Sequence, residues 1–235
     1  MKITLLTGKT FDLENAFDFP LKVNTSYKLK RLSLRIDHKK RLVVLSLPKW
    51  YGKKKAFEFI NEHLDWIEQK LAELPKMKDF EDGEEISLFG NLVKICYDSD
   101  FGAPKLIDNT LYVGGEKEFL HRRIKDYIKR EAKKEFYNLT KSLADKINKK
   151  LQGVTIKDTK SRWGSCSTLN HINYNWRIAL APKATIDYLM AHEVAHLAHP
   201  DHSQAFWRTV DELNPNAYAG KKWLEKHGNE LYLYR

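Results

Sequence analysis

The spacing of apolar residues changes character part-way along this chain. Between residues 28 and 113 apolar and polar residues mostly alternate, which is typical of strands with one buried face. One stretch at helical spacing, residues 55–74, interrupts the alternation, and Pro75 ends it. The alternation predicts three β-hairpins, over residues 28–36 with 41–47, 86–89 with 92–97, and 105–107 with 110–113.

From residue 116 onward most apolar residues recur at helical spacing instead. Gly114 and Gly115 mark the change. We therefore expect an α+β protein with two parts, a β-hairpin-rich region with one inserted helix at residues 1–115 and a second domain at residues 116–235. The second domain is expected to contain helices at 116–149, 186–199, from Ser203 to the Asn214–Pro215 pair and at 217–227, and short strands at 154–157 and 172–180.

Composition adds limited information. The chain has 235 residues and a net charge of +10, which is compatible with a nucleic-acid partner but is equally typical of a solvated lysine-rich surface. Cys96 and Cys166 are the only cysteines, so neither a disulfide framework nor a thiolate metal site is indicated. No signal-peptide core or run of 18 apolar residues is present, and we expect a cytoplasmic protein without a membrane partner. Trp50, Tyr51 and Trp66 are expected to pack rather than to bind a ligand.

One motif in the expected 186–199 helix indicates a metal site. His192 and His196 stand four residues apart, so both imidazoles lie on one helix face and reach a single metal ion. Glu193 lies beside that face, where a carboxylate can act as general base on an activated water. An HExxH match alone also occurs by chance on amphipathic helices. Burying two histidines and a glutamate is costly without a partner, which favours a catalytic zinc site.

A catalytic zinc usually takes a third protein ligand. His199 lies about 10 Å along the helix axis from His192 if the helix is unbroken, because each residue rises about 1.5 Å. Pro200 stops the helix and lets the chain turn, so His202 is the favoured third ligand. His199 and Asp201 are then expected to support the ligands.

The remaining candidates surround this motif. The tight RWGSCS loop at residues 162–167 precedes the expected strand at 172–180, which we expect to be an edge strand that holds an extended substrate. Arg162, Tyr174 and His199 are candidate substrate contacts or donors to an oxyanion. For Arg162 a structural role, as an ion pair with Asp187 or as a loop strut, is an equal alternative. Cys166 is expected to be a packed or loop residue rather than a nucleophile.

These stretches resemble a known family. The RWGSCS loop, the DY pair at 187–188, the HExxHL stretch at 192–197, and the HS and FW pairs at 202–203 and 206–207 are similar to the YgjP-like metallopeptidase domain proteins, which are related to SprT-like zinc peptidases. The resemblance extends over most of the chain. It implies a minimal zincin-like metallopeptidase core, an active-site helix plus a small sheet, with an N-terminal β-rich extension. It also implies zinc on His192, His196 and His202 with Glu193 as catalytic acid and base.

The expected function is therefore hydrolysis of peptide bonds in a peptide or protein substrate, through a metal-activated water and Glu193. Two alternatives stay open. One is a DNA-associated, SprT-like protease, a link that rests on analogy. The other is a non-proteolytic metal-dependent hydrolase, or a binding module with a vestigial zinc, although a purely structural zinc would have no need of Glu193.

Overall fold

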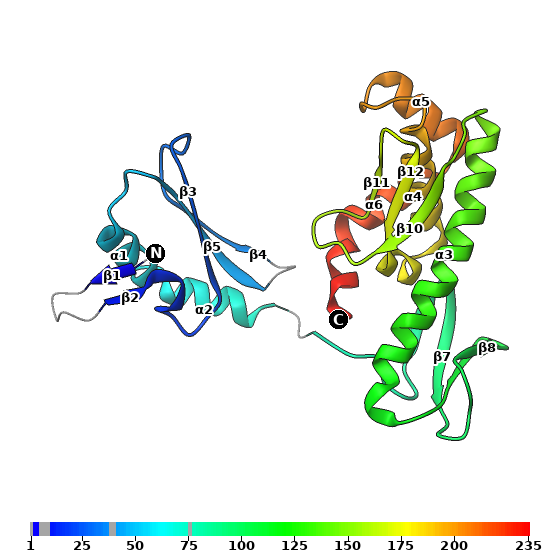
Figure 1. Cartoon of the computed structure of the whole chain (residues 1–235), viewed down its shortest axis with the longest axis horizontal. Coiled ribbons are helices and arrows are strands. Elements are labelled where there is room, and N and C mark those ends of the chain that lie inside the picture. The colour runs from blue at the N-terminus through cyan, green and yellow to red at the C-terminus, as the bar shows by residue number, and fades with distance from the viewer. Residues whose placement is uncertain (1, 5–9, 38–40, 75–76) are drawn as a thin grey trace. The chain divides into compact units, whose positions relative to one another are not determined.

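The computed structural model describes residues 2–4, 10–37, 41–74 and 77–235 (Figure 1). The chain forms two compact units, an N-terminal unit of residues 1–76 and a C-terminal unit of residues 77–235. Both contain helices and strands, which confirms the α+β class. Among the described residues, no helix is long and apolar enough to span a bilayer.

The N-terminal unit is a small sheet covered by two helices. In the central sheet β5 lies between β3, which runs parallel to it, and β4, which runs antiparallel. Leu21, Val43 and Leu45 of this sheet pack with Ala56 and Ile60 of the first helix. The elements are β1 (Lys2–Thr4), β2 (Thr10–Asp12), a 3-10 turn (Leu13–Asn15), β3 (Leu21–Ser26), β4 (Ser33–Asp37), β5 (Leu42–Pro48), α1 (Lys53–Asn61) and α2 (Leu64–Ala72).

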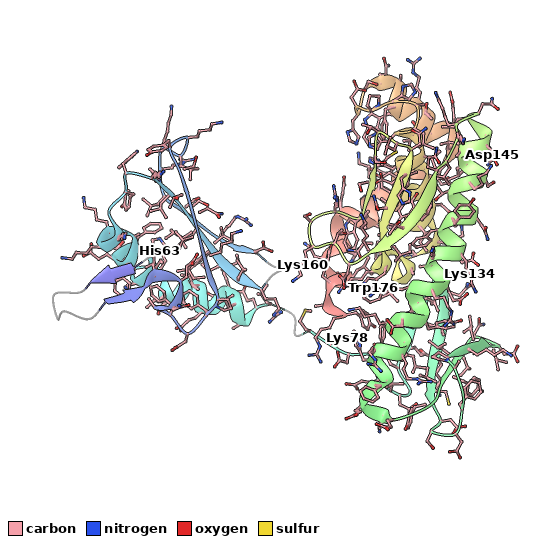
Figure 2. All side chains as sticks on the ribbon, viewed as in Figure 1. His63, Lys78, Lys134, Asp145, Lys160 and Trp176 are labelled. Carbon is pink, nitrogen blue, oxygen red and sulfur yellow. The ribbon has the colours of Figure 1, made fainter. Side chains whose placement is uncertain are left out.

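Two expectations for this unit need correction. The sequence pattern indicated no element over β3, which is a parallel partner of β5 rather than part of a hairpin. The helix expected at 55–74 is two helices, α1 and α2. At the break, the His63 imidazole lies 2.8 Å from the Phe59 carbonyl, while the His63 N–H donates to Ile60 instead (Figure 2). The side chain thus takes the carbonyl that a continuous helix would use.

The C-terminal unit contains two sheets joined by a long helix, α3, which packs against β9, β10 and α4 (Figure 1). The sheet orders are β6-β7-β9-β8 and β10-β12-β11. The elements are β6 (Glu85–Leu88), β7 (Asn91–Tyr97), β8 (Lys105–Ile107), β9 (Thr110–Val113), a 3-10 turn (Lys117–Phe119), α3 (Leu120–Lys146), β10 (Gly153–Lys157), β11 (Gly164–Cys166), β12 (His171–Asn175), a 3-10 helix (Trp176–Leu180), α4 (Lys183–Ala195), α5 (Gln204–Leu213), α6 (Ala217–His227) and a terminal 3-10 segment (Gly228–Leu233).

The inner face of α3 fixes the two sheets to one core. Phe136 is fully buried, and its ring lies 5.6 Å from Tyr174 of β12 and 6.1 Å from Phe89 of the β6–β7 turn, centroid to centroid. Lys134 and Asp145, labelled on the same helix in Figure 2, are exposed. The helix expected at 116–149 therefore forms with slightly shorter ends and has the amphipathic character its spacing predicted.

The boundary expected at residue 115 lies inside the C-terminal unit. The β6–β7 hairpin explains why, because it packs against the start of α4. The Phe89 N–H donates to the Ala179 carbonyl at 2.7 Å, and Gly90 meets Lys183 in the first turn of α4. Residues 77–115 thus support the helix that carries the HExxH motif, although their hairpin pattern resembles that of the N-terminal unit.

The strand expected at 172–180 is shorter and differently placed. β12 ends at Asn175, whose side chain accepts a hydrogen bond from the Arg177 N–H at 3.0 Å and starts the 3-10 helix. β12 is also the central strand of its sheet, between β10 and β11, so it is not an edge strand. The edge strands are β10 and β11, and β11 lies in the stretch that the sequence predicted as a loop.

A pair of glycine substitutions tests whether the hairpin supports α4. Gly90→Ala should lower the free energy of unfolding by about 2 kcal/mol or more. Gly90 has a φ of +85°, and an added Cβ would also lie 2.7 Å from the Lys183 Cβ. Gly83→Ala is the control, since φ is +79° there but nothing lies within 4 Å, and backbone strain alone costs about 1 kcal/mol. Equal losses in urea unfolding of the two variants would contradict the packing role.

Candidate metal centre

Three histidines converge at the end of α4. Nitrogen atoms of His192, His196 and His202 all lie within 4.8 Å of one another, and the His192 and His202 Nε2 atoms are 3.3 Å apart. A tetrahedral ion with Zn–N distances of about 2.05 Å separates its ligand nitrogens by about 3.3 Å. The three side chains therefore fit a single metal ion.

The chain reaches this geometry because α4 ends early. The helix ends at Ala195 rather than His199, and the His199 N–H donates back to the Ala195 carbonyl at 2.9 Å. The following turn through Pro200 brings His202 to the two helix histidines, as the sequence predicted. Asp201 holds the turn, because its Oδ1 accepts from the Ser203 N–H at 3.3 Å.

Hydrogen bonds orient two of the rings. His196 Nδ1 lies 3.0 Å from the His199 carbonyl, which places the proton on Nδ1 and leaves the Nε2 lone pair for a metal. His192 Nδ1 lies 3.4 Å from the Tyr188 hydroxyl. The His199 ring points to Thr209, at 3.2 Å, so this residue supports the site through its carbonyl while its imidazole stays outside the triad.

Aromatic side chains of α5 pack behind the histidines. The Phe206 ring is fully buried and its centroid lies 4.5–5.0 Å from those of His192, His196 and His202. Ser203 caps α5, because its hydroxyl accepts from the Phe206 N–H, as its position before the helix predicted. The capping residue directly follows His202, and Phe206 is four residues after it, so the start of α5 holds the third histidine in place.

Glu193 is buried beside the triad, with 4% of its surface exposed. Its Oε2 has no hydrogen-bond partner among the described residues, which is costly for a buried carboxylate. Burial raises the pKa of Glu193 to about 8, against an opposing effect of Arg162. Burial lowers the pKa of His192 to about 4, helped by the neighbouring His196 and His202. The site thus disfavours protonated imidazoles and leaves a carboxylate oxygen without a partner, as expected around a bound cation.

Gly164 makes room for that carboxylate. A Cβ at this position would lie 2.3 Å from the Glu193 Oε1, so any other residue would displace the side chain. Sequence reasoning did not assign this role, because the contact joins β11 to α4 across the fold. The glycine within the RWGSCS loop was the only sequence signal.

A cleft of about 490 Å³ opens over the three histidines. Its walls come from the edge strand β11, the loop on either side of it, and α4 with the turn that follows. The lining residues are Arg162, Gly164, Ser165, Cys166, Ser167, Thr168, His192, Glu193, His196, Pro200 and His202.

Comparison with known proteins agrees with this geometry. The family model described as YgjP-like, metallopeptidase domain, matches residues 30–227. The chain belongs to the YgjP-like metallopeptidase domain family. Family membership makes it a metallopeptidase, which implies a divalent metal and peptide or protein substrates.

Among solved structures, this YgjP-like domain is similar to the crystal structure of the metallopeptidase zymogen abylysin of Pyrococcus abyssi. The two are 23% identical, the match covers 38% of this chain and 91% of abylysin, and the TM-score is 0.35. No curated protein matches the sequence.

The candidate oxyanion donors of this YgjP-like domain differ in whether they reach the cleft. Arg162 lines the cleft, and its loop is anchored by the Thr159 hydroxyl, which donates to the Arg162 carbonyl at 2.7 Å. The alternative ion pair is not formed, because Asp187 pairs with Lys183. Tyr174 is buried, and its hydroxyl lies 3.0 Å from Thr140 Oγ1, on the α3 side of the sheet.

Cys166 lines the cleft and is half-buried. Burial, with a further effect of Glu193, raises the pKa of the thiol to about 11. The thiol therefore stays protonated at neutral pH, which agrees with the expectation that it is not a nucleophile.

Substitution of single histidines tests the ligand set. His202→Ala should lose bound metal on dialysis, because one of three converging nitrogens is removed. His199→Ala should retain it, since that ring bonds Thr209 and its carbonyl remains. Elemental analysis of the two variants decides the assignment; loss of metal from His199→Ala alone would reverse it.

The burial of Glu193 predicts a pH-dependent stability in the chelator-treated chain. Between the ordinary pKa of 4.5 and about 8, the unfolded chain has released the Glu193 proton and the folded chain has not, so rising pH favours unfolding. Glu193→Gln removes this effect. The variant should gain stability over the parent as pH rises through this window, by on the order of a few kcal/mol, and the gain should level off above pH 8.

The measurement is urea unfolding at several pH values in the presence of chelator. Glu212→Gln is the matched control, because Glu212 is exposed on α5. A stability difference between Glu193→Gln and the parent that does not change with pH would contradict the buried, protonated carboxylate.

Proposed function

We propose that this chain is a zinc-dependent peptidase in which His192, His196 and His202 hold the metal and Glu193 is the general base. The observation that supports this most strongly is the buried, unpartnered Oε2 of Glu193 beside three converging imidazoles. A set of three imidazoles suits zinc among the divalent metals. Bound there, zinc supplies a Lewis acid that activates water near neutral pH and polarises a carbonyl.

Glu193 takes up and passes on the proton. With a pKa of about 8 the carboxyl would be protonated at neutral pH, but a divalent cation nearby favours its ionised form. Metal binding therefore makes the base available. The ionised Glu193 accepts a proton from the attacking water and delivers it to the leaving amine of the cleaved peptide. Gly164 keeps its carboxylate in reach by leaving space at Oε1.

The edge strand β11 is the proposed place for the substrate. β11 pairs only with β12 in its sheet, and it lines the cleft beside the histidines. An extended peptide laid along its free edge would satisfy the main-chain groups of β11 and pass over the metal centre. The proposed substrate strand is therefore β11 and not β12, the central strand, which the sequence analysis expected to hold the substrate.

Arg162 is the proposed donor to the oxyanion that forms at the scissile carbonyl. It lines the cleft and lies close enough to Glu193 to oppose the rise in that residue's pKa. Its loop is braced from the C-terminal segment, since the Tyr232 hydroxyl donates to the Thr159 carbonyl at 3.0 Å and the Tyr232 ring packs on Trp163. The braced loop backbone keeps the exposed Arg162 side chain at the cleft, where its charge would stabilise the oxyanion.

Glu193→Gln tests the function. The variant should keep its metal and lose peptide cleavage by a factor of about 10² to 10⁴, because the amide cannot accept the proton. The measurement is digestion of a peptide library by the zinc-loaded chain, followed by mass spectrometry. Glu212→Gln should cleave as well as the parent, since Glu212 is exposed on α5 outside the cleft.

Undiminished cleavage by Glu193→Gln would remove the general-base assignment. Full metal content in the parent with no cleavage of any peptide would favour a non-proteolytic metal-dependent hydrolase instead.

A further inference from the structure

Positive charge is concentrated in one part of the N-terminal unit. Between residues 22 and 55 the chain has twelve Lys or Arg residues and one acidic residue, Asp37, whereas the whole chain has 41 against 31. This segment comprises β3, β4, β5 and the start of α1. The metal centre lies in the other unit, so its chemistry gives no reason for this concentration.

The cations of this segment have few acidic partners. Arg35 lies 4.0 Å from Asp37, and Lys54 lies 3.9 Å from Glu58. The other described lysines and arginines, apart from Arg41, form no ion pair with a described acidic residue. They are Lys22, Lys28, Lys30, Arg31, Lys49, Lys53 and Lys55, all exposed. The surface of α3 differs from this segment, because its cations are interspersed with acidic residues that pair with them. One example is the Lys141–Asp145 ion pair.

The face of this sheet that points away from the α1–α2 core has exposed cations on both outer strands. Leu21, Val23 and Leu45 belong to the core with α1 and α2, so their strand neighbours point to the opposite face. On that face Lys22 of β3 and Arg35 of β4 both pair in register with Val44 of β5. The two exposed cations therefore flank Val44, which is itself only 1% exposed.

Two exposed aromatic rings stand at one end of the same sheet. β3 and β5 run parallel, so the residues after both strands emerge at the same end, where the Lys49 N–H donates to the Ser26 carbonyl at 3.2 Å. Tyr27 is 75% exposed and Trp50 is 69% exposed. The Lys49 ammonium lies 4.7 Å from the centre of the Tyr27 ring, which links the two aromatic positions.

Trp50 was expected to pack, and it does not pack in the core. Its neighbour Tyr51 does pack against the core, as expected, whereas Trp66, also expected to pack, is 39% exposed and lies outside the core cluster. The two exposed rings and the exposed cations around them form one mixed surface. They combine the two features that bind a polynucleotide, a charged track for phosphates and flat rings on which bases stack.

We propose that the Tyr27–Trp50 end of the β3–β5–β4 sheet, together with the exposed lysines and arginines beside it, binds single-stranded nucleic acid. The lysines and arginines contact the phosphates, and Tyr27 and Trp50 stack on unpaired bases. A duplex offers its phosphates but not its base faces, and an acidic peptide offers charge without flat rings. The exposed aromatics therefore favour a single strand over both.

The test measures binding of the full chain to labelled single strands of about 12 nucleotides, one DNA and one RNA, by fluorescence anisotropy. The parent should bind at least one of them more tightly than the matching duplex or polyglutamate, and binding should weaken steeply with salt. The comparison of DNA with RNA identifies the natural class of strand. Peptide cleavage is not the readout, so the outcome is independent of the proposed peptidase function.

Trp50→Ala and Tyr27→Ala should each weaken binding to the single strand about tenfold, because each removes one stacking ring. Tyr218→Ala is the matched control, since Tyr218 is 74% exposed on α6, and it should bind as the parent does. Circular dichroism and thermal unfolding check that the exposed substitutions leave the fold intact.

Either of two results would overturn the proposal. One is unchanged affinity in both Trp50→Ala and Tyr27→Ala. The other is equal or tighter binding of the parent to duplex or to polyglutamate, which would mean that charge alone is recognised and would identify the partner as a duplex or an acidic protein.

Discussion

The C-terminal unit depends on the convergence of three imidazoles at the point where α4 ends. Two of them come from one helix face and the third from the turn that follows Pro200, so the helix must stop where it does for the nitrogens to meet. Burial disfavours the protonated form of His192 and the ionised form of Glu193. Both groups are costly to bury unless a cation joins them, which ties the stability of this region to metal binding.

Several distant parts of the chain maintain this arrangement. The β6–β7 hairpin packs on the first turn of α4, α5 places Phe206 behind the histidines, and β11 leaves space for Glu193 at Gly164. The C-terminal segment braces the loop before β11 through Tyr232 and Thr159. Contacts from four separate parts of the unit thus hold the three histidines and Glu193 together.

The two units differ in charge as well as in fold. The N-terminal unit combines uncompensated cations with exposed rings, while the C-terminal unit encloses the metal centre and balances most of its surface charge.

The sequence by itself determined the features that depend on local spacing. It predicted the helix faces, the hairpins at 86–97 and 105–113, the capped helix after Ser203, and the convergence of His192, His196 and His202, because each follows from residues within one or two turns or across a short loop. The tertiary structure decided what depends on contacts between distant residues. It placed β11 rather than β12 at the sheet edge, buried the Tyr174 hydroxyl against Thr140, directed His199 to Thr209, and joined residues 77–115 to the metal-binding unit. Strand order and the burial of a single side chain are set by which surfaces meet in the folded chain, and residue spacing carries no information on that.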